Sequence, residues 1–133
     1  MATLEDVRAL ASALPGVTEG ERHGNVTWYV GKKAFAWERP FSKADIRRFG
    51  DATPPAGPII AVCVEDLLEK EAVLTTSPPG FFTIPHFDGY SAVLIRLEAV
   101  TKKGLRDALV DGWLACAPSQ LADDYLKGRS SRG

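Results

Sequence analysis

The chain has 133 residues, a length that fits one domain and is too short for two independent cores. Hydrophobic residues make up 45% and charged residues 25%, a balance that is typical of a folded globular protein and excludes a disordered chain. The formal net charge of -1 excludes a global attraction to nucleic acid or an anionic membrane, so any such attraction has to be local. We expect one domain over residues 1–127 and a flexible tail over 128–133.

The first residues show no basic stretch followed by an apolar one, which is the mark of a secretory signal. No run approaches the roughly 18 apolar residues that a membrane span needs. We therefore expect a cytoplasmic protein without a membrane segment. The two cysteines, Cys63 and Cys116, lack metal-type spacing and are expected to be buried free thiols.

The first predicted element is a helix over residues 4–14, where apolar residues recur at helical spacing. Thr3 precedes this stretch and Asp6 follows three residues later, a pair typical of a capping box. Pro15 and Gly16 end the pattern, because neither residue favours a continuing helix.

Residues 26–37 predict a β-hairpin, since β-branched and aromatic residues flank a Gly-Lys pair at 31–32 that suits a type II′ turn. A two-residue loop pairs Trp28 with Phe35. This register places Trp28, Phe35 and Trp37 on one face of the hairpin, where we expect them to join the core.

The later elements follow from capping residues, turn signals and apolar periodicity. They are a short helix over 42–49 capped by Ser42, a loop over 51–58, a strand over 59–64, a helix over 66–73, strands over 81–84 and 91–99, and a helix over 105–116 with a further one starting near Pro118. This order, with short connections between strands, predicts an α+β fold: an antiparallel sheet with N- and C-terminal helices packed on one face.

Three segments together resemble the MmcQ/YjbR family: Leu14-Pro15-Gly16-Val17, the aromatic hairpin segment 28–37, and the segment 82–87. The similarity covers nearly the whole chain, and it rests on the order and spacing of the segments. The resemblance implies a frataxin-like (CyaY-like) α+β fold and DNA binding through a double-wing arrangement. It implies no catalytic residues. The iron binding known for frataxin-like folds needs an acidic ridge that this sequence does not offer.

Positive charge is concentrated between residues 32 and 48, where six basic residues outnumber two acidic ones. If the hairpin tip and one side of the short helix line up, they form a surface that tracks the phosphates of DNA. The alternative is an ordinary solvated basic face. The predicted nucleic-acid-binding residues are Lys32, Lys33, Arg39, Lys43, Arg47 and Arg48.

A second candidate site consists of His23, Trp37 and His86, because both histidines lie beside turns and can flank a pocket for a small molecule or a protein partner. The alternative is that the histidines make structural hydrogen bonds. A zinc site needs three or four ligands, so Glu21 or Asp88 would have to complete it, and we assign no metal site.

Nothing in the sequence assembles a catalytic set, since the chain has no GxSxG elbow, Walker A motif or GxGxxG motif. We therefore assign no catalytic residue and expect no cofactor. The sequence favours a non-catalytic DNA-binding protein, and the alternative is an adaptor domain for a small molecule or protein.

Overall fold

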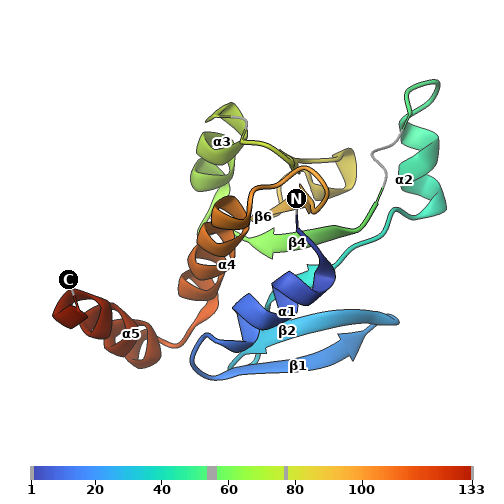
Figure 1. Ribbon diagram of the computed structural model, residues 1–133. Helices are drawn as coiled ribbons and strands as arrows, with labels where there is room; N and C mark the ends of the chain where they lie inside the picture. The colour runs from blue at the N-terminus through green and yellow to red at the C-terminus, as the bar shows by residue number, and fades with distance from the viewer. Residues whose placement is uncertain (1, 54–56, 77, 133) are drawn as a thin grey trace.

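The structure, a computed structural model, describes residues 2–53, 57–76 and 78–132, with side chains as far as Gly128. Its described strands form one six-stranded antiparallel sheet in the order β1-β2-β3-β4-β6-β5 (Figure 1). The strands are β1 (Val17–Arg22), β2 (Asn25–Val30), β3 (Lys33–Glu38), β4 (Ile59–Cys63), β5 (Phe81–Phe82) and β6 (Ala92–Arg96). Of the loop predicted over 51–58, residues 54–56 lie outside the described part.

The helices are α1 (Leu4–Ser12), α2 (Lys43–Arg48), α3 (Leu67–Thr76), the 3-10 turn η1 (Pro85–Phe87), α4 (Lys102–Cys116) and α5 (Ser119–Arg132). Helices α1 and α4 pack on the same face of the sheet (Figure 1), and α5 joins them through Tyr125, whose ring lies 5.0 Å from that of Trp113. The predicted α+β fold is confirmed. Helix α5 continues to Arg132, through most of the segment expected to be a flexible tail. No helix in the described ranges is long and apolar enough to cross a membrane.

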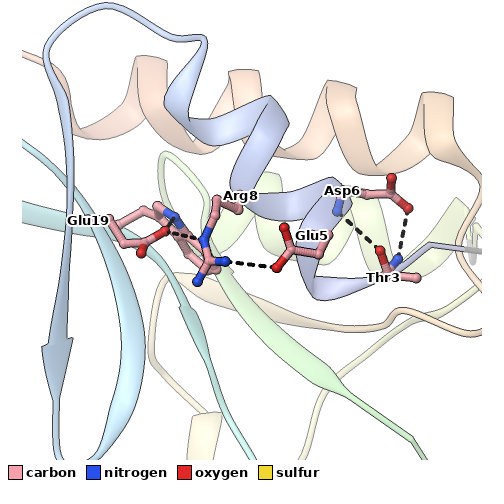
Figure 2. Close-up of polar contacts among 6 residues, drawn as sticks. Thr3, Glu5, Asp6, Arg8 and Glu19 are labelled. Carbon is pink, nitrogen blue, oxygen red and sulfur yellow. Dashed lines mark hydrogen bonds and ion pairs between the residues drawn. The ribbon is translucent and has the colours of Figure 1, made fainter.

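Helix α1 begins with the predicted capping box and is tied to the first two strands (Figure 2). The backbone N–H of Thr3 donates to Asp6 Oδ2 at 2.9 Å, and the N–H of Asp6 donates to Thr3 Oγ1 at 3.2 Å. Arg8 Nε donates to Glu19 Oε1 of β1 at 2.9 Å, and the same oxygen accepts a hydrogen bond from Trp28 Nε1 at 3.0 Å. One carboxylate thus fixes the helix above the β1–β2 hairpin.

The main core lies between the sheet and helices α1 and α4. Trp113 is fully buried in it, and its indole N–H donates to the Pro15 carbonyl at 2.9 Å. Each fully buried large side chain contributes roughly 1.5–3 kcal/mol to folding. Other members of this core are Val7, Ala11, Trp28, Val30, Phe35, Ile60, Val62, Ile95, Leu97, Leu105 and Leu109.

The predicted register of the β2–β3 hairpin is correct beside the turn and wrong beyond it. Trp28 pairs with Ala36 rather than Phe35, because the register shifts after the turn and makes Phe35 an extra residue in β3. This is the geometry of a β-bulge. Phe35 stays with Trp28 in the main core, but Trp37 moves to the opposite face. The expectation that all three aromatic residues share one face was therefore wrong.

Trp37 belongs to a second, smaller core on the sheet face opposite the long helices. This core is covered by η1 and by partly buried aromatic residues from the segments flanking α2. Its buried members are Trp37, Ile59, Ala61, Ile84, Phe87, Ala92 and Leu94. Because the bulge turns Trp37 to this side, the second face of the sheet is rich in aromatic residues. This face lies next to the basic helix α2.

Candidate functional site

The six predicted DNA-contacting residues do not form one surface. Lys32 lies in the β2–β3 turn and Lys33 begins β3, whereas Arg39 follows the other end of that strand and leads into α2. The six residue steps from Lys33 to Arg39 separate the two groups by about 20 Å, and Figure 1 shows α2 far from the β2–β3 turn. The expected alignment of the hairpin tip with the short helix is therefore absent. Arg39, Lys43, Arg47 and Arg48 stay together around α2.

Helix α2 is organised around a buried carboxylate, Asp45, which is 3% exposed. Ser42 and Asp45 form a reciprocal capping box: the Ser42 N–H donates to Asp45 Oδ2 at 2.9 Å, and the Asp45 N–H donates to Ser42 Oγ at 3.1 Å. Arg39 Nη2 lies 3.0 Å from the same carboxylate, and Arg48 Nη1 lies 3.8 Å away. The one acidic side chain of the helix is thus turned inward and neutralised.

The pKa of Asp45 shows which of these effects dominates. Burial alone raises the pKa of this carboxyl, but the hydrogen bonds from Ser42 and the positive charge of Arg39 outweigh burial and hold the pKa below its ordinary value. Asp45 therefore stays ionised at neutral pH. The negative charge of Asp45 is balanced inside the protein by Ser42 and Arg39. In contrast, Lys43, Arg47 and Arg48 are exposed to solvent.

Arginine and aromatic side chains make a continuous array on the second face of the sheet. The Arg22 guanidinium lies 5.5 Å from the ring centre of Trp37, and that of Arg39 lies 5.5 Å from Phe87. Tyr90 connects the two rings, at 6.3 Å from Trp37 and 5.6 Å from Phe87. Such cation–π contacts orient the arginines and keep their charge at the surface. Tyr90 is 48% exposed, so the array reaches solvent.

The loop that carries Tyr90 is anchored by hydrogen bonds from Lys70 of α3. This lysine is buried, and its ammonium group donates to the carbonyl oxygens of Phe87 and Tyr90, the latter at 2.8 Å. Burial lowers the pKa of Lys70, partly offset by the negative charge of Asp88. The two hydrogen bonds fix the segment between η1 and β6 against the sheet.

The structure does not assemble His23, Trp37 and His86 into the predicted pocket. His23 is exposed in the β1–β2 turn, where its φ of 54° is unusual for a residue other than glycine. His86 is exposed on η1, with its ring 6.1 Å from Phe87. Trp37 is 8% exposed beneath Arg22. No described contact joins the three side chains, so they form no common pocket wall.

A cavity, called the larger cavity below, lies on the other side of the molecule, where α3, α4 and α5 meet the sheet. Its volume is about 680 Å³. Apolar side chains from the sheet and helices form part of the lining, and four carboxylates contribute to it: Glu65, Glu69, Asp107 and Asp111. Asp107 is paired with Lys103 at 2.8 Å. The smaller cavity, of about 530 Å³, lies beside Lys70 and Asp88. Neither cavity is lined by His23, Trp37 or His86.

Cys63 and Cys116 were expected to be buried free thiols; both are free, but they are only partly buried. Each thiol acts on the pKa of the other. Cys63 lowers the pKa of Cys116 to about 7, burial opposes this change, and the charge of Lys33 adds to it. Cys116, together with burial, raises the pKa of Cys63. The sequence gives no spacing signal for this pair.

No group of three or more His, Cys, Asp or Glu side chains among the described residues is placed to hold a metal ion. The thiol pair therefore supplies two ligands at most, which is fewer than a structural zinc site requires.

Three curated proteins are similar to the chain over almost its full length. They are the uncharacterized proteins Rv2570 and MT2646 from Mycobacterium tuberculosis and Mb2600 from Mycobacterium bovis. Each is 41% identical over 129 residues, which covers 95% of this chain and 97% of the relative. No family model matches the chain, and no solved structure matches it. The chain belongs to the same family as these mycobacterial proteins.

Proposed function

We propose that the protein is a non-catalytic DNA-binding module that contacts phosphates through helix α2. The observation that supports this most strongly is the arrangement of charge on α2: Lys43, Arg47 and Arg48 are exposed, whereas Asp45 is buried against Arg39. A helix whose cations face solvent and whose acid is turned inward attracts a polyanion. The resemblance to the MmcQ/YjbR family favours the same function.

The site favours contacts with the DNA backbone over reading of base sequence. Lysine and arginine fix a protein on a duplex through phosphates, which carry no sequence information. Ile46 lies among the cations of α2 and is 50% exposed, so an apolar contact with a sugar accompanies the charge contacts. The helix has six residues, which makes it about 9 Å long. A helix of this length presents no long recognition surface.

Charge-reversal variants test whether DNA binds at α2 or at the β2–β3 turn. The double variant Lys43→Glu/Arg47→Glu should reduce affinity for a fluorescently labelled duplex at least about tenfold at about 50 mM salt, since it removes two phosphate contacts and adds two repulsions. The matched control is Lys32→Glu/Lys33→Glu, which makes the same charge change at the other end of β3. Fluorescence anisotropy measures both. Equal losses for the two variants, or no binding by the unmodified protein, contradict the proposal.

A second candidate function is the binding of a small organic cation in the larger cavity. Its volume of about 680 Å³ is in the range of ligand sites, and its lining combines apolar side chains with four carboxylates. The isosteric series 4-phenylbutylamine, 4-phenylbutanol and 4-phenylbutyrate tests this by NMR chemical-shift titration. The amine should bind most tightly and shift amides of α3 and α4. Equal shifts with all three compounds, or none with the amine, exclude this function.

A further inference from the structure

The acidic and basic side chains of strand β1 face opposite sides of the sheet. Glu19 is hydrogen-bonded to helix α1, and Glu21 pairs with Val26, which packs against the main core. Because side chains alternate along a strand, the next residue, Arg22, is directed to the second face of the sheet. Its guanidinium lies there, 5.5 Å from the ring centre of Trp37. Strand β1 thus brings a positive charge, and neither of its carboxylates, to the second face.

Arg39 connects this face to the exposed cations of α2. Its Nη2 atom lies 3.0 Å from the carboxylate of Asp45, and its guanidinium lies 5.5 Å from the ring centre of Phe87. The side chain of Arg39 is 18% exposed, so these contacts hold it between the helix and the array of arginine and aromatic side chains. The surface of α2 and the array are therefore adjacent, and a long ligand bound by one can reach the other.

Tyr90 is the ring of the array that is open to a ligand. It is 48% exposed, whereas its neighbours Trp37 and Phe87 are buried. Packing against these two rings, at 6.3 and 5.6 Å, holds the tyrosine ring in place. Lys70 fixes its backbone, since the ammonium group donates to the Tyr90 carbonyl at 2.8 Å. A ring held in this way loses little conformational freedom when a planar ligand stacks on it.

We propose that this surface binds single-stranded DNA, with an unpaired base stacked on Tyr90 and an adjoining phosphate held by Arg22. Aromatic rings and basic side chains are the groups that bind the bases and the backbone of a single strand. The bases of a duplex are paired and stacked on their neighbours, so they cannot stack on Tyr90 without being flipped out. A duplex therefore keeps only the phosphate contacts. The proposal rests on the proposed DNA binding by α2 and names the form of DNA that uses the array.

A comparison of two DNA strands tests the stacking without changing the protein. The probes are a labelled oligothymidylate of about 20 nucleotides and an abasic strand of the same length, which carries the same phosphates but no bases. Fluorescence anisotropy at about 50 mM salt should show at least about fivefold tighter binding of the oligothymidylate. Equal affinities for the two strands overturn the proposal.

The substitution Tyr90→Ala identifies the ring that stacks. It should lower the affinity for the oligothymidylate at least about fivefold, because the platform is lost. The affinities for the abasic strand and for a duplex should stay unchanged, which also shows that the variant is folded. Tyr90→Phe keeps the ring and should keep all three affinities. Equal losses for the alanine and phenylalanine variants, or an alanine variant that binds the oligothymidylate normally, overturn the proposal.

The substitution Arg22→Gln tests the phosphate contact beside the ring. It should reduce the slope of the logarithm of the oligothymidylate binding constant against the logarithm of the salt concentration by about 0.7, the value for one phosphate of a single strand. The matched control is Arg106→Gln, which removes an exposed arginine of α4 on the opposite side of the sheet and should leave the slope unchanged. Equal slopes for the two variants contradict the role of Arg22.

Charge reversal on α2 separates this proposal from the one on which it rests. The variant Lys43→Glu/Arg47→Glu should weaken the binding of the oligothymidylate and the abasic strand alike. If it does, and the two strands nevertheless bind equally to the unmodified protein, α2 binds DNA but no base stacks on Tyr90. No binding of any strand contradicts both proposals. Tighter binding of oligouridylate or of oligoglutamate overturns the assignment to DNA, in favour of RNA or an acidic protein segment.

Discussion

The substitution Asp45→Asn tests how α2 is held in place. Asparagine keeps the size of the side chain but removes the charge that accepts hydrogen bonds from Ser42 and Arg39. A hydrogen bond to a charged group contributes roughly 1 kcal/mol more than a neutral one. With two such bonds lost, the free energy of unfolding should fall by about 2 kcal/mol at pH 7. The control Asp51→Asn replaces an exposed carboxylate and should change the free energy of unfolding by less than about 0.5 kcal/mol.

The pH dependence of this loss gives the sharper test. The pKa of Asp45 is lower in the folded state than in the unfolded chain, so its contribution is present above the unfolded value of about 3.9 and is lost as the pH falls through the folded value. The difference between the two proteins should therefore shrink below about pH 4. This difference in the free energy of unfolding is measured by urea unfolding, with tryptophan fluorescence as the probe. A difference that stays constant down to pH 3, or is absent at pH 7, refutes the assignment of Asp45 as an ionised anchor.

Two further substitutions test the packing around the candidate sites. Gly112→Ala should destabilise the protein by about 1–2 kcal/mol because its methyl group clashes with β4, whereas Gly128→Ala, which meets nothing within 4 Å, should be neutral or slightly stabilising in thermal unfolding. Lys70→Met removes the charged donor to the carbonyls of Phe87 and Tyr90, which keep only their backbone hydrogen bonds, and should cost about 2 kcal/mol. Hydrogen exchange should then accelerate in the segment 85–90 and stay unchanged in β4; equal acceleration in both speaks against a local clamp.

Local signals in the sequence predicted most of the elements, although the strand β1 was missed. The pairs Thr3 and Asp6, and Ser42 and Asp45, stand at the starts of two helices and form the expected reciprocal hydrogen bonds. Such caps depend on residues three positions apart, so the sequence contains all the information that they need. The antiparallel sheet was also predicted from a local feature, because short connections between strands favour antiparallel pairing.

Features that depend on distant contacts were not predictable in this way. A bulge leaves no mark in the alternation of β3, so the shift at Phe35 and the transfer of Trp37 to the other face were missed. The basic residues were close in sequence, but a whole strand separates Lys33 from Arg39 in space. The effect of Cys63 on the pKa of Cys116 depends on how α4 crosses the sheet, which no local pattern reports.

The salt dependence of DNA binding by the unmodified protein is the most direct test of its proposed function. Three exposed cations on α2, contacting about three phosphates, give a slope of about -2.7 for the logarithm of the binding constant against the logarithm of the salt concentration. Affinity for a labelled duplex should then fall about 40-fold between about 50 and 200 mM salt. Fluorescence anisotropy that shows this slope supports DNA binding by α2. No binding at about 50 mM salt, or an affinity that does not change with salt, contradicts it.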